Sequence, residues 1–161
     1  MIITPIPAFD DNYIWAIQPT ANADAVIVDP GDETPVLNWL KTQDVGLASI
    51  LITHHHWDHT DGLVPLLEHF KVPVYGPANP KIKGISVKLT EGDSFTPAGL
   101  ETEFKVIETP GHTLDHLSFY AADTDPGLLF CGDTLFSAGC GRMFEGTAEQ
   151  FYTSLRKLAE L

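Results

Sequence analysis

The sequence predicts an α/β protein in which a sandwich of two mixed sheets lies between flanking helices. Three observations predict this class. Short apolar segments bounded by turn residues recur along the chain, as expected for many short strands. Other segments carry apolar residues at helical spacing. The segment Leu47–Thr53 is apolar almost throughout, which is typical of a strand buried on both faces. These patterns leave the order of the strands open.

The helices are predicted from apolar residues three or four positions apart. Leu63, Leu66 and Phe70 share one face of such a segment. The last helix begins with a capping box, in which Thr147 is the N-cap and Gln150 stands three residues later. The expected helices are Pro35–Lys41, Asp61–Phe70 and a final helix after Thr147.

The strands are predicted from short apolar or alternating segments that end at Gly, Pro, Asp or Asn. The expected strands are Asn12–Gln18, Asp24–Asp29, Leu47–Thr53, Val72–Tyr75, Ile85–Leu89, Ser94–Phe95, Leu100–Glu108, His116–Ala121 and Leu128–Cys131. Open α/β sheets usually carry their chemistry in the loops beyond the strand C-termini. Polar residues directly after these strands are therefore the candidates for function.

Length and charge narrow the classes of function. The 161 residues suffice for one domain with a real core. The net charge of −13 argues against binding to nucleic acid or to anionic membranes. The sequence shows no membrane-spanning run and no signal peptide, and its two cysteines form no disulfide framework. A cytoplasmic location is expected on these grounds.

The most informative segment is Thr-His-His-His-Trp-Asp-His at residues 53–59. On an extended backbone, His54 and His56 point the same way because they are two residues apart. Asp58 and His59 follow at once and can serve a second ion beside the first. Imidazole and carboxylate groups are ligands that suit zinc, so this segment predicts a metal site.

Two further residues stand directly beyond predicted strands. His112 follows Leu100–Glu108, and Asp133 follows Leu128–Cys131. If the three strand ends converge, they can supply two metal centres. The first centre would comprise His54, His56 and His112. The second would comprise Asp58 and His59, with Asp133 as the candidate bridge, since a carboxylate has two oxygens to share.

The remaining histidines and the cysteines are expected to have supporting roles. His55 points away from its two neighbours, which favours packing or a hydrogen bond to another residue over metal ligation. His116 either orients a ligand or simply begins a strand. Cys131 and Cys140 are expected to be buried structural thiols, because nitrogen and oxygen ligands already dominate the cluster.

Several motifs together resemble one known family. They are Ile6–Tyr13, Val28–Asp32, Thr53–His59, Thr109–Thr113, Gly132–Phe136, Ala138–Arg142 and Phe144–Ala148. The chain resembles glyoxalase II (hydroxyacylglutathione hydrolase), within the metallo-β-lactamase superfamily. The superfamily shares the histidine motif widely, whereas the stretch from Cys140 to Thr147 is much more specific to the glyoxalase II branch.

The resemblance implies an αββα sandwich with a dinuclear site at one edge. It implies hydrolysis of the thioester S-D-lactoylglutathione to D-lactate and glutathione. It assigns His54, His56 and His112 to one metal, Asp58 and His59 to the other, and Asp133 to the bridge. Asp58 would also orient the hydroxide that attacks the carbonyl. Arg142 and Phe144 stand at positions that help to hold the glutathione moiety.

The chain departs from the family pattern in three ways. The family carries another histidine ligand in a strand after the last helix, and then a helical domain that contacts glutathione. The chain ends before both, so residues 1–161 are expected to be a catalytic domain truncated before the substrate domain, with a second metal site that lacks one ligand. In addition, Asp61 and Asp115 stand where the family usually has glycine.

Alternative functions remain open at this point. Two divalent ions are expected, with zinc preferred over iron or manganese. A persulfide dioxygenase would instead use a single iron, and a truncated domain could bind metal yet catalyse little. A lactonase or β-lactamase would follow from fold analogy alone. The oligomeric state cannot be deduced from the sequence.

Overall fold

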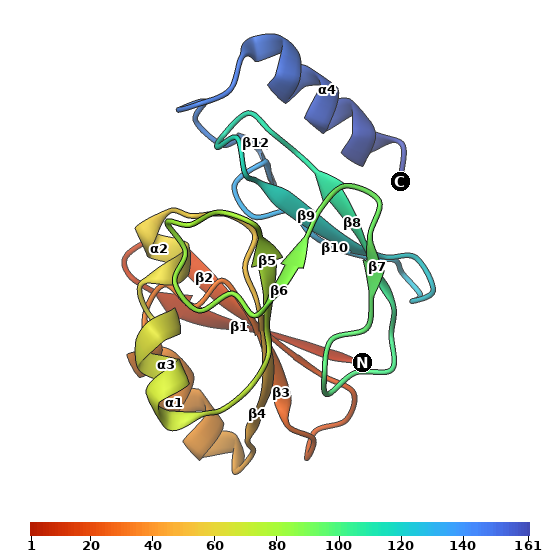
Figure 1. Ribbon diagram of the computed structural model, residues 1–161. Helices are drawn as coiled ribbons and strands as arrows, with labels where there is room; N and C mark the ends of the chain where they lie inside the picture. The colour runs from red at the N-terminus through yellow and green to blue at the C-terminus, as the bar shows by residue number, and fades with distance from the viewer.

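Two sheets lie face to face, with helices on their outer sides, in the computed structural model, which describes residues 1–161 (Figure 1). The larger sheet contains, in spatial order, β1 (Ile2–Ala8), β2 (Asn12–Gln18), β3 (Ala25–Val28), β4 (Leu47–Leu51), β5 (Val74–Pro77) and β6 (Val87–Leu89). The smaller sheet contains β10 (Leu128–Phe130), β9 (Leu117–Ala121), β8 (Phe104–Glu108) and β7 (Ser94–Phe95). The predicted α/β sandwich is confirmed.

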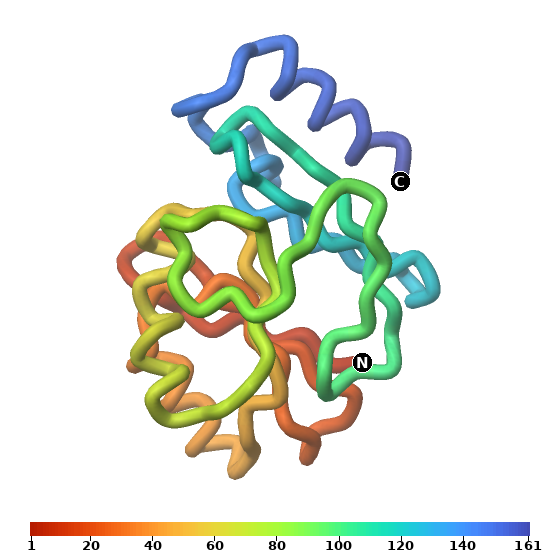
Figure 2. Tube along the Cα trace, in the orientation of Figure 1, coloured from red at the N-terminus to blue at the C-terminus, as the bar shows by residue number.

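The chain builds the two halves in succession. The Cα trace shows the larger sheet forming from the first half of the chain and the smaller sheet from the second (Figure 2). The larger sheet is mixed, because β1, β2 and β3 pair antiparallel and β3 to β6 pair parallel. The smaller sheet is antiparallel throughout, whereas two mixed sheets were expected. A short hairpin of β11 (Leu135–Phe136) and β12 (Gly139–Cys140) follows β10.

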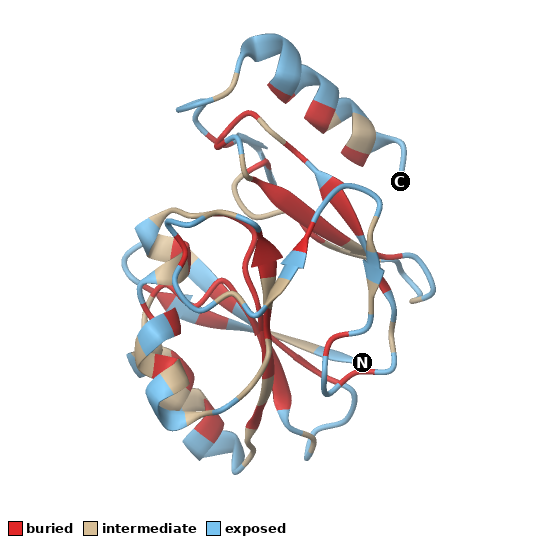
Figure 3. Ribbon diagram, in the orientation of Figure 1, coloured by how far each residue is buried: buried red, intermediate tan, exposed pale blue.

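Two apolar cores hold the layers together. Ile27 and Ile50 face α1 (Glu33–Gln43) and α3 (Leu63–His69), which cover the outer side of the larger sheet. Their chain neighbours Val26 and Leu51 point the other way and pack on Phe104 of the smaller sheet. Successive residues of a strand face opposite sides, so these strands are buried on both faces, as the apolar run Leu47–Thr53 predicts. The buried residues of both sheets are coloured in Figure 3.

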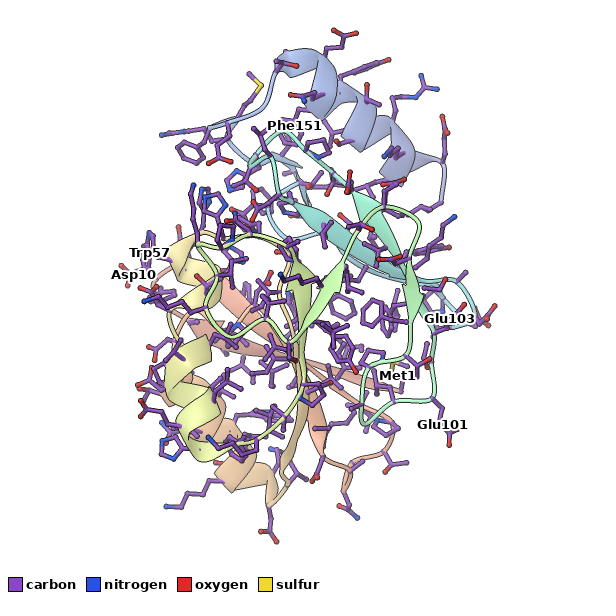
Figure 4. All side chains as sticks on the ribbon, in the orientation of Figure 1. Met1, Asp10, Trp57, Glu101, Glu103 and Phe151 are labelled. Atoms are coloured by element: carbon purple, nitrogen blue, oxygen red, sulfur yellow. The ribbon has the colours of Figure 1, made fainter.

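The last helix, α4 (Ala148–Ala159), lies beside the smaller sheet, on the side away from the larger sheet. The predicted capping box is present, since Thr147 Oγ1 accepts from Gln150 N and Gln150 Oε1 accepts from Thr147 N. Phe151, labelled in Figure 4, is buried on the inner face of the helix. Ser154 Oγ donates to the carbonyl of Pro110 at 2.8 Å, which attaches the helix to the loop after β8.

Several predicted boundaries differ from the observed ones. The strand β1 was not predicted, because Pro5 and Pro7 interrupt it. The strand tolerates both prolines because β1 is at the edge of the sheet. Pro5 and Pro7 are two residues apart, so their missing N–H groups fall on the same side of the strand. The helix expected at Asp61–Phe70 is observed as α3, and a separate single turn, α2 (Trp57–Thr60), precedes it.

None of the four helices combines the length and the apolarity needed to cross a membrane.

Candidate metal centre

The predicted ligands come together where three strands end. His54 and His56 lie in the loop after β4, His112 in the loop after β8, and Asp133 in the loop after β10. One nitrogen from each of His54, His56 and His112 lies within 4.8 Å of the others. Asp133 Oδ2 lies 3.3 Å from His112 Nε2, and its Oδ1 lies 3.2 Å from His59 Nε2. The three loops therefore converge as the sequence predicts.

His54 presents an unprotonated nitrogen to this space. Thr53 Oγ1 donates to Asp29 Oδ2 at 2.7 Å, so the same hydroxyl must accept from His54 Nδ1, 3.0 Å away. With the proton on Nδ1, Nε2 keeps its lone pair. That atom is buried and has no hydrogen-bond partner. A buried nitrogen with a free lone pair and no hydrogen-bond partner fits a metal ligand.

His112 and His56 complete the first set. His112 Nδ1 donates to the carbonyl oxygen of Arg142 at 2.6 Å, which leaves the lone pair on Nε2. His112 Nε2 lies 2.9 Å from His56 Nδ1. Burial, together with the neighbouring imidazoles, lowers the pKa of both His54 and His56. Neutral imidazoles are the form that binds metal ions, so His54 and His56 fit a metal ion, and His112 turns Nε2 toward the same space.

Asp29 orients His59 and was missed as a site residue by the sequence reasoning. Its Oδ2 accepts from His59 Nδ1 at 3.0 Å, and its Oδ1 accepts from Thr53 N at 2.7 Å. Both oxygens of Asp29 thus accept hydrogen bonds, and Asp29 contacts the His59 ring at Nδ1, on the side opposite Nε2. Asp29 therefore orients the His59 ring. Its position directly beyond β3, at the same sheet edge as the histidines, could have indicated this role.

Asp133 faces both groups of ligands with different oxygens. Gly132 directly precedes it with φ of +43°. A Cβ at Gly132 would lie 2.5 Å from Thr53 Oγ1, so only glycine allows this approach. The backbone N–H of Asp133 donates to His116 Nε2 at 3.1 Å. This arrangement supports a bridging position for the carboxylate.

His59 has a strong excess of negative charge around it. Burial opposes a charge on this imidazole, but Asp133, Asp29 and Asp58 outweigh burial and raise its pKa well above the usual value. Asp58 Oδ2 lies 3.5 Å from His59 Nε2, and the pKa of Asp58 is lowered chiefly by its interaction with that ring. A divalent cation could replace the proton on Nε2, which lacks a hydrogen bond of good geometry. The donor set therefore fits a second ion.

The sequence left open whether His116 orients a ligand or simply begins a strand, and the structure favours the first. It is fully buried, its Nδ1 lies 2.9 Å from Thr109 Oγ1, and its ring stacks on His54 with centroids 4.8 Å apart. Burial, together with the neighbouring imidazole of His112, lowers its pKa to about 3, so it stays neutral. His116 supports both His54 and Asp133.

Arg142 and Phe144 lie beside the first set of ligands. The Phe144 ring centroid is 5.4 Å from that of His56 and 5.3 Å from that of His112. Arg142 Cζ lies 5.7 Å from the Phe144 centroid. Both side chains are exposed.

A cleft of about 510 Å³ opens beside the second set of ligands. His59 and Asp133 contribute to its wall, and Tyr13, Trp15 and Phe136 supply apolar surface. Its volume is that of a small-molecule site.

The expectation for the cysteines was wrong in part. Cys140 is exposed, and Cys131 is only partly buried. Burial raises the pKa of Cys131, whose thiol donates to the carbonyl of Leu135. Its sulfur is therefore held as a thiol.

Comparison with known proteins identifies the class. Residues 8–161 match the model of the metallo-beta-lactamase superfamily, and the chain belongs to that superfamily. Its members bind divalent metal ions, in keeping with the clusters described above.

Eight curated relatives are 47% to 54% identical to the chain and are all named hydroxyacylglutathione hydrolase. One of them, from Idiomarina loihiensis, is 54% identical over 161 residues, which is 100% of this chain and 61% of the relative. The chain spans 58% to 62% of the length of these relatives.

Solved structures agree with the fold. The BLEG-1 B3 metallo-beta-lactamase has a TM-score of 0.83 and 26% identity, covering 96% of this chain and 84% of that one. The protein TTHA1623 in a di-iron-bound form has a TM-score of 0.80 and 26% identity, covering 98% of this chain and 86% of that one.

Proposed function

We propose that residues 1–161 form a catalytic domain that hydrolyses a glutathione thioester, S-D-lactoylglutathione, to D-lactate and glutathione. The observation that carries the proposal is the position of Asp133 between the histidine set and His59. The names of the curated relatives support the substrate class. Zinc is the proposed metal, with iron or manganese as alternatives that the same nitrogen and oxygen ligands accept.

The proposed metal ligands are those the sequence predicts. His54, His56 and His112 would hold one ion, Asp58 and His59 the other, and Asp133 would contact both. When bound, two divalent ions lower the pKa of water and polarise a carbonyl oxygen. Water is the proposed nucleophile, because Cys131, the cysteine that lines the cleft, is held as a thiol.

The chain's own residues would orient the reactants. The Asp58 carboxylate would accept a hydrogen bond from the attacking water. Asn12 Nδ2 steadies Asp58 by donating to its backbone carbonyl oxygen at 3.2 Å. The guanidinium of Arg142 can pair with a substrate carboxylate through two parallel hydrogen bonds. Phe144 offers an apolar face next to the metal ligands. A small-molecule thioester is thus the proposed partner, in a cytoplasmic setting that suits the free cysteines.

The substitution His56→Ala tests this proposal. It removes one of three nitrogens from the first set, so zinc binding there and thioester hydrolysis should both be lost. The matched control is His69→Ala, at the exposed end of α3, which should bind zinc and hydrolyse thioester as the unaltered chain does. Unchanged hydrolysis in His56→Ala would refute the assignment.

A single-iron persulfide dioxygenase remains the rival enzyme. The rival needs only one ion, whereas Asp133 directs an oxygen at each of two ligand groups. Oxygen consumption with glutathione persulfide, in the absence of thioester hydrolysis, would decide for the rival. Zinc binding without either activity would identify a metal-binding domain of little catalytic power.

A further inference from the structure

A second polar cluster lies next to the ligands and contains none of them. His55 Nδ1 lies 2.8 Å from Asp115 Oδ1, and Asn79 Nδ2 donates to Asp115 Oδ2 at 2.7 Å. The side chains of His55 and Asp115 are only 10% and 14% exposed. Hydrogen bonds to a carboxylate are stronger in such dry surroundings than in water. Both oxygens of Asp115 are therefore held in place.

The His55–Asp115 contact joins the two loops that carry the first ligand set. His55 stands between His54 and His56 in the chain, and its ring is directed to Asp115 instead of the metal site. Asp115 follows His112 by three residues. The contact spans 60 residues of sequence, so it fixes one ligand loop against the other.

The same cluster reaches the loop of the proposed substrate contacts. Glu145, the neighbour of Phe144, accepts from Leu114 N at 3.0 Å through Oε2. Its Oε1 lies 3.4 Å from His55 Nε2. Lys81 Nζ lies 3.1 Å from the same nitrogen and 3.5 Å from Glu145 Oε1. The Lys81 ammonium already supplies a positive charge beside the carboxylate of Glu145. The cluster is therefore better suited to holding the loops together than to binding a third ion.

We propose that Asp115 is a positioning residue that acts through His55 to hold His54 and His56 at the right separation from His112. The inference rests on the proposed metal centre. With the His55 ring fixed, the backbone on either side of it cannot turn the two ligands away. Partners that orient ligands commonly change metal affinity 10- to 100-fold when they are removed.

Zinc titration of the full chain by calorimetry tests the proposal. Asp115→Ala should bind zinc roughly 10- to 100-fold more weakly than the unaltered chain. It should also change the visible absorption of the cobalt-substituted protein, which reports the ligand geometry. Asp115→Asn should recover most of the affinity, since its amide oxygen can still accept from His55. Asp123→Ala, an exposed aspartate in the turn before β10, is the control and should change neither measurement.

A double substitution shows whether Asp115 acts through His55. In a chain that carries His55→Ala, the further change Asp115→Ala should have no additional effect on zinc affinity. If Asp115→Ala impairs folding, Asn79→Ala, which frees one oxygen of Asp115, should weaken zinc binding in the same direction by a smaller factor.

Three results would overturn the proposal. They are unaltered zinc affinity and cobalt absorption in Asp115→Ala, a loss of thermal stability alone, and an equal effect of Asp115→Ala with and without His55. Thioester hydrolysis is measured separately. A chain that binds zinc as expected but does not hydrolyse the thioester would refute the proposed function and leave the role of Asp115 intact.

Discussion

At the scale of single residues, Asp29 shows how a side chain outside the ligand set determines which nitrogens are free. One carboxylate accepts from Thr53 N, Thr53 Oγ1 and His59 Nδ1. It thereby sets the tautomer of His54 through Thr53 and that of His59 directly. Asp29 adopts φ of 54°, a conformation that aspartate tolerates better than most residues.

The substitution Asp29→Asn should weaken zinc binding by roughly 10- to 100-fold. Asparagine tolerates the same backbone conformation, but its amide must donate where the aspartate accepts. The reversal would move the proton of His54 onto Nε2 and would keep the last proton of His59 on Nε2, and these are the atoms proposed to face the ions. Calorimetric titration with zinc measures the change, and unaltered affinity at both sites would contradict the tautomer assignment.

At the scale of elements, the site depends on where strands end. β3 and β4 run parallel, so Asp29 and His54 emerge at the same sheet edge. The smaller sheet brings His112 and Asp133 to that edge from loops after β8 and β10. Sequence patterns predicted most of these strands because each is short, apolar and bounded by turn residues. β1 escaped prediction because its two prolines are acceptable only in an edge strand, and edge position is a tertiary property.

The capping box of α4 gives a prediction at this scale. Thr147→Ala removes the acceptor for Gln150 N and should lower the free energy of unfolding by ~1 kcal/mol. Urea unfolding measures this loss. Thr153→Ala, on the exposed side of the same helix, is the matched control and should change stability little. Equal effects of the two substitutions would show that the cap contributes nothing.

At the scale of the whole molecule, the proposed metal ions would offset a concentration of negative charge. The chain carries a net charge of −13, and Asp29, Asp58 and Asp133 surround His59. Bound cations would neutralise these carboxylates and join loops from both sheets. Metal binding is therefore expected to stabilise the entire fold.

Removal of metal should lower the melting temperature measurably. At free zinc 100-fold above the dissociation constant, binding stabilises the folded state by about 2.7 kcal/mol. Thermal unfolding with zinc and then with excess chelator measures the difference. The His56→Ala chain should show a smaller difference, and an equal one would place the stabilising ion outside the first ligand set.

The sequence by itself determined the residue types for metal chemistry, the strands that end beside them and the class of fold. These are local properties, since periodicity, turn residues and motif spacing are read within a few positions. Only the tertiary structure decided which imidazole nitrogens are free, that Asp133 faces two ligand groups, and that Asp29 and Asp115 hold histidines. The contacts of Asp29 and Asp115 join residues 24, 30 and 60 positions apart. No local pattern encodes them, because they exist only once two sheets pack and bring their loops to a common edge.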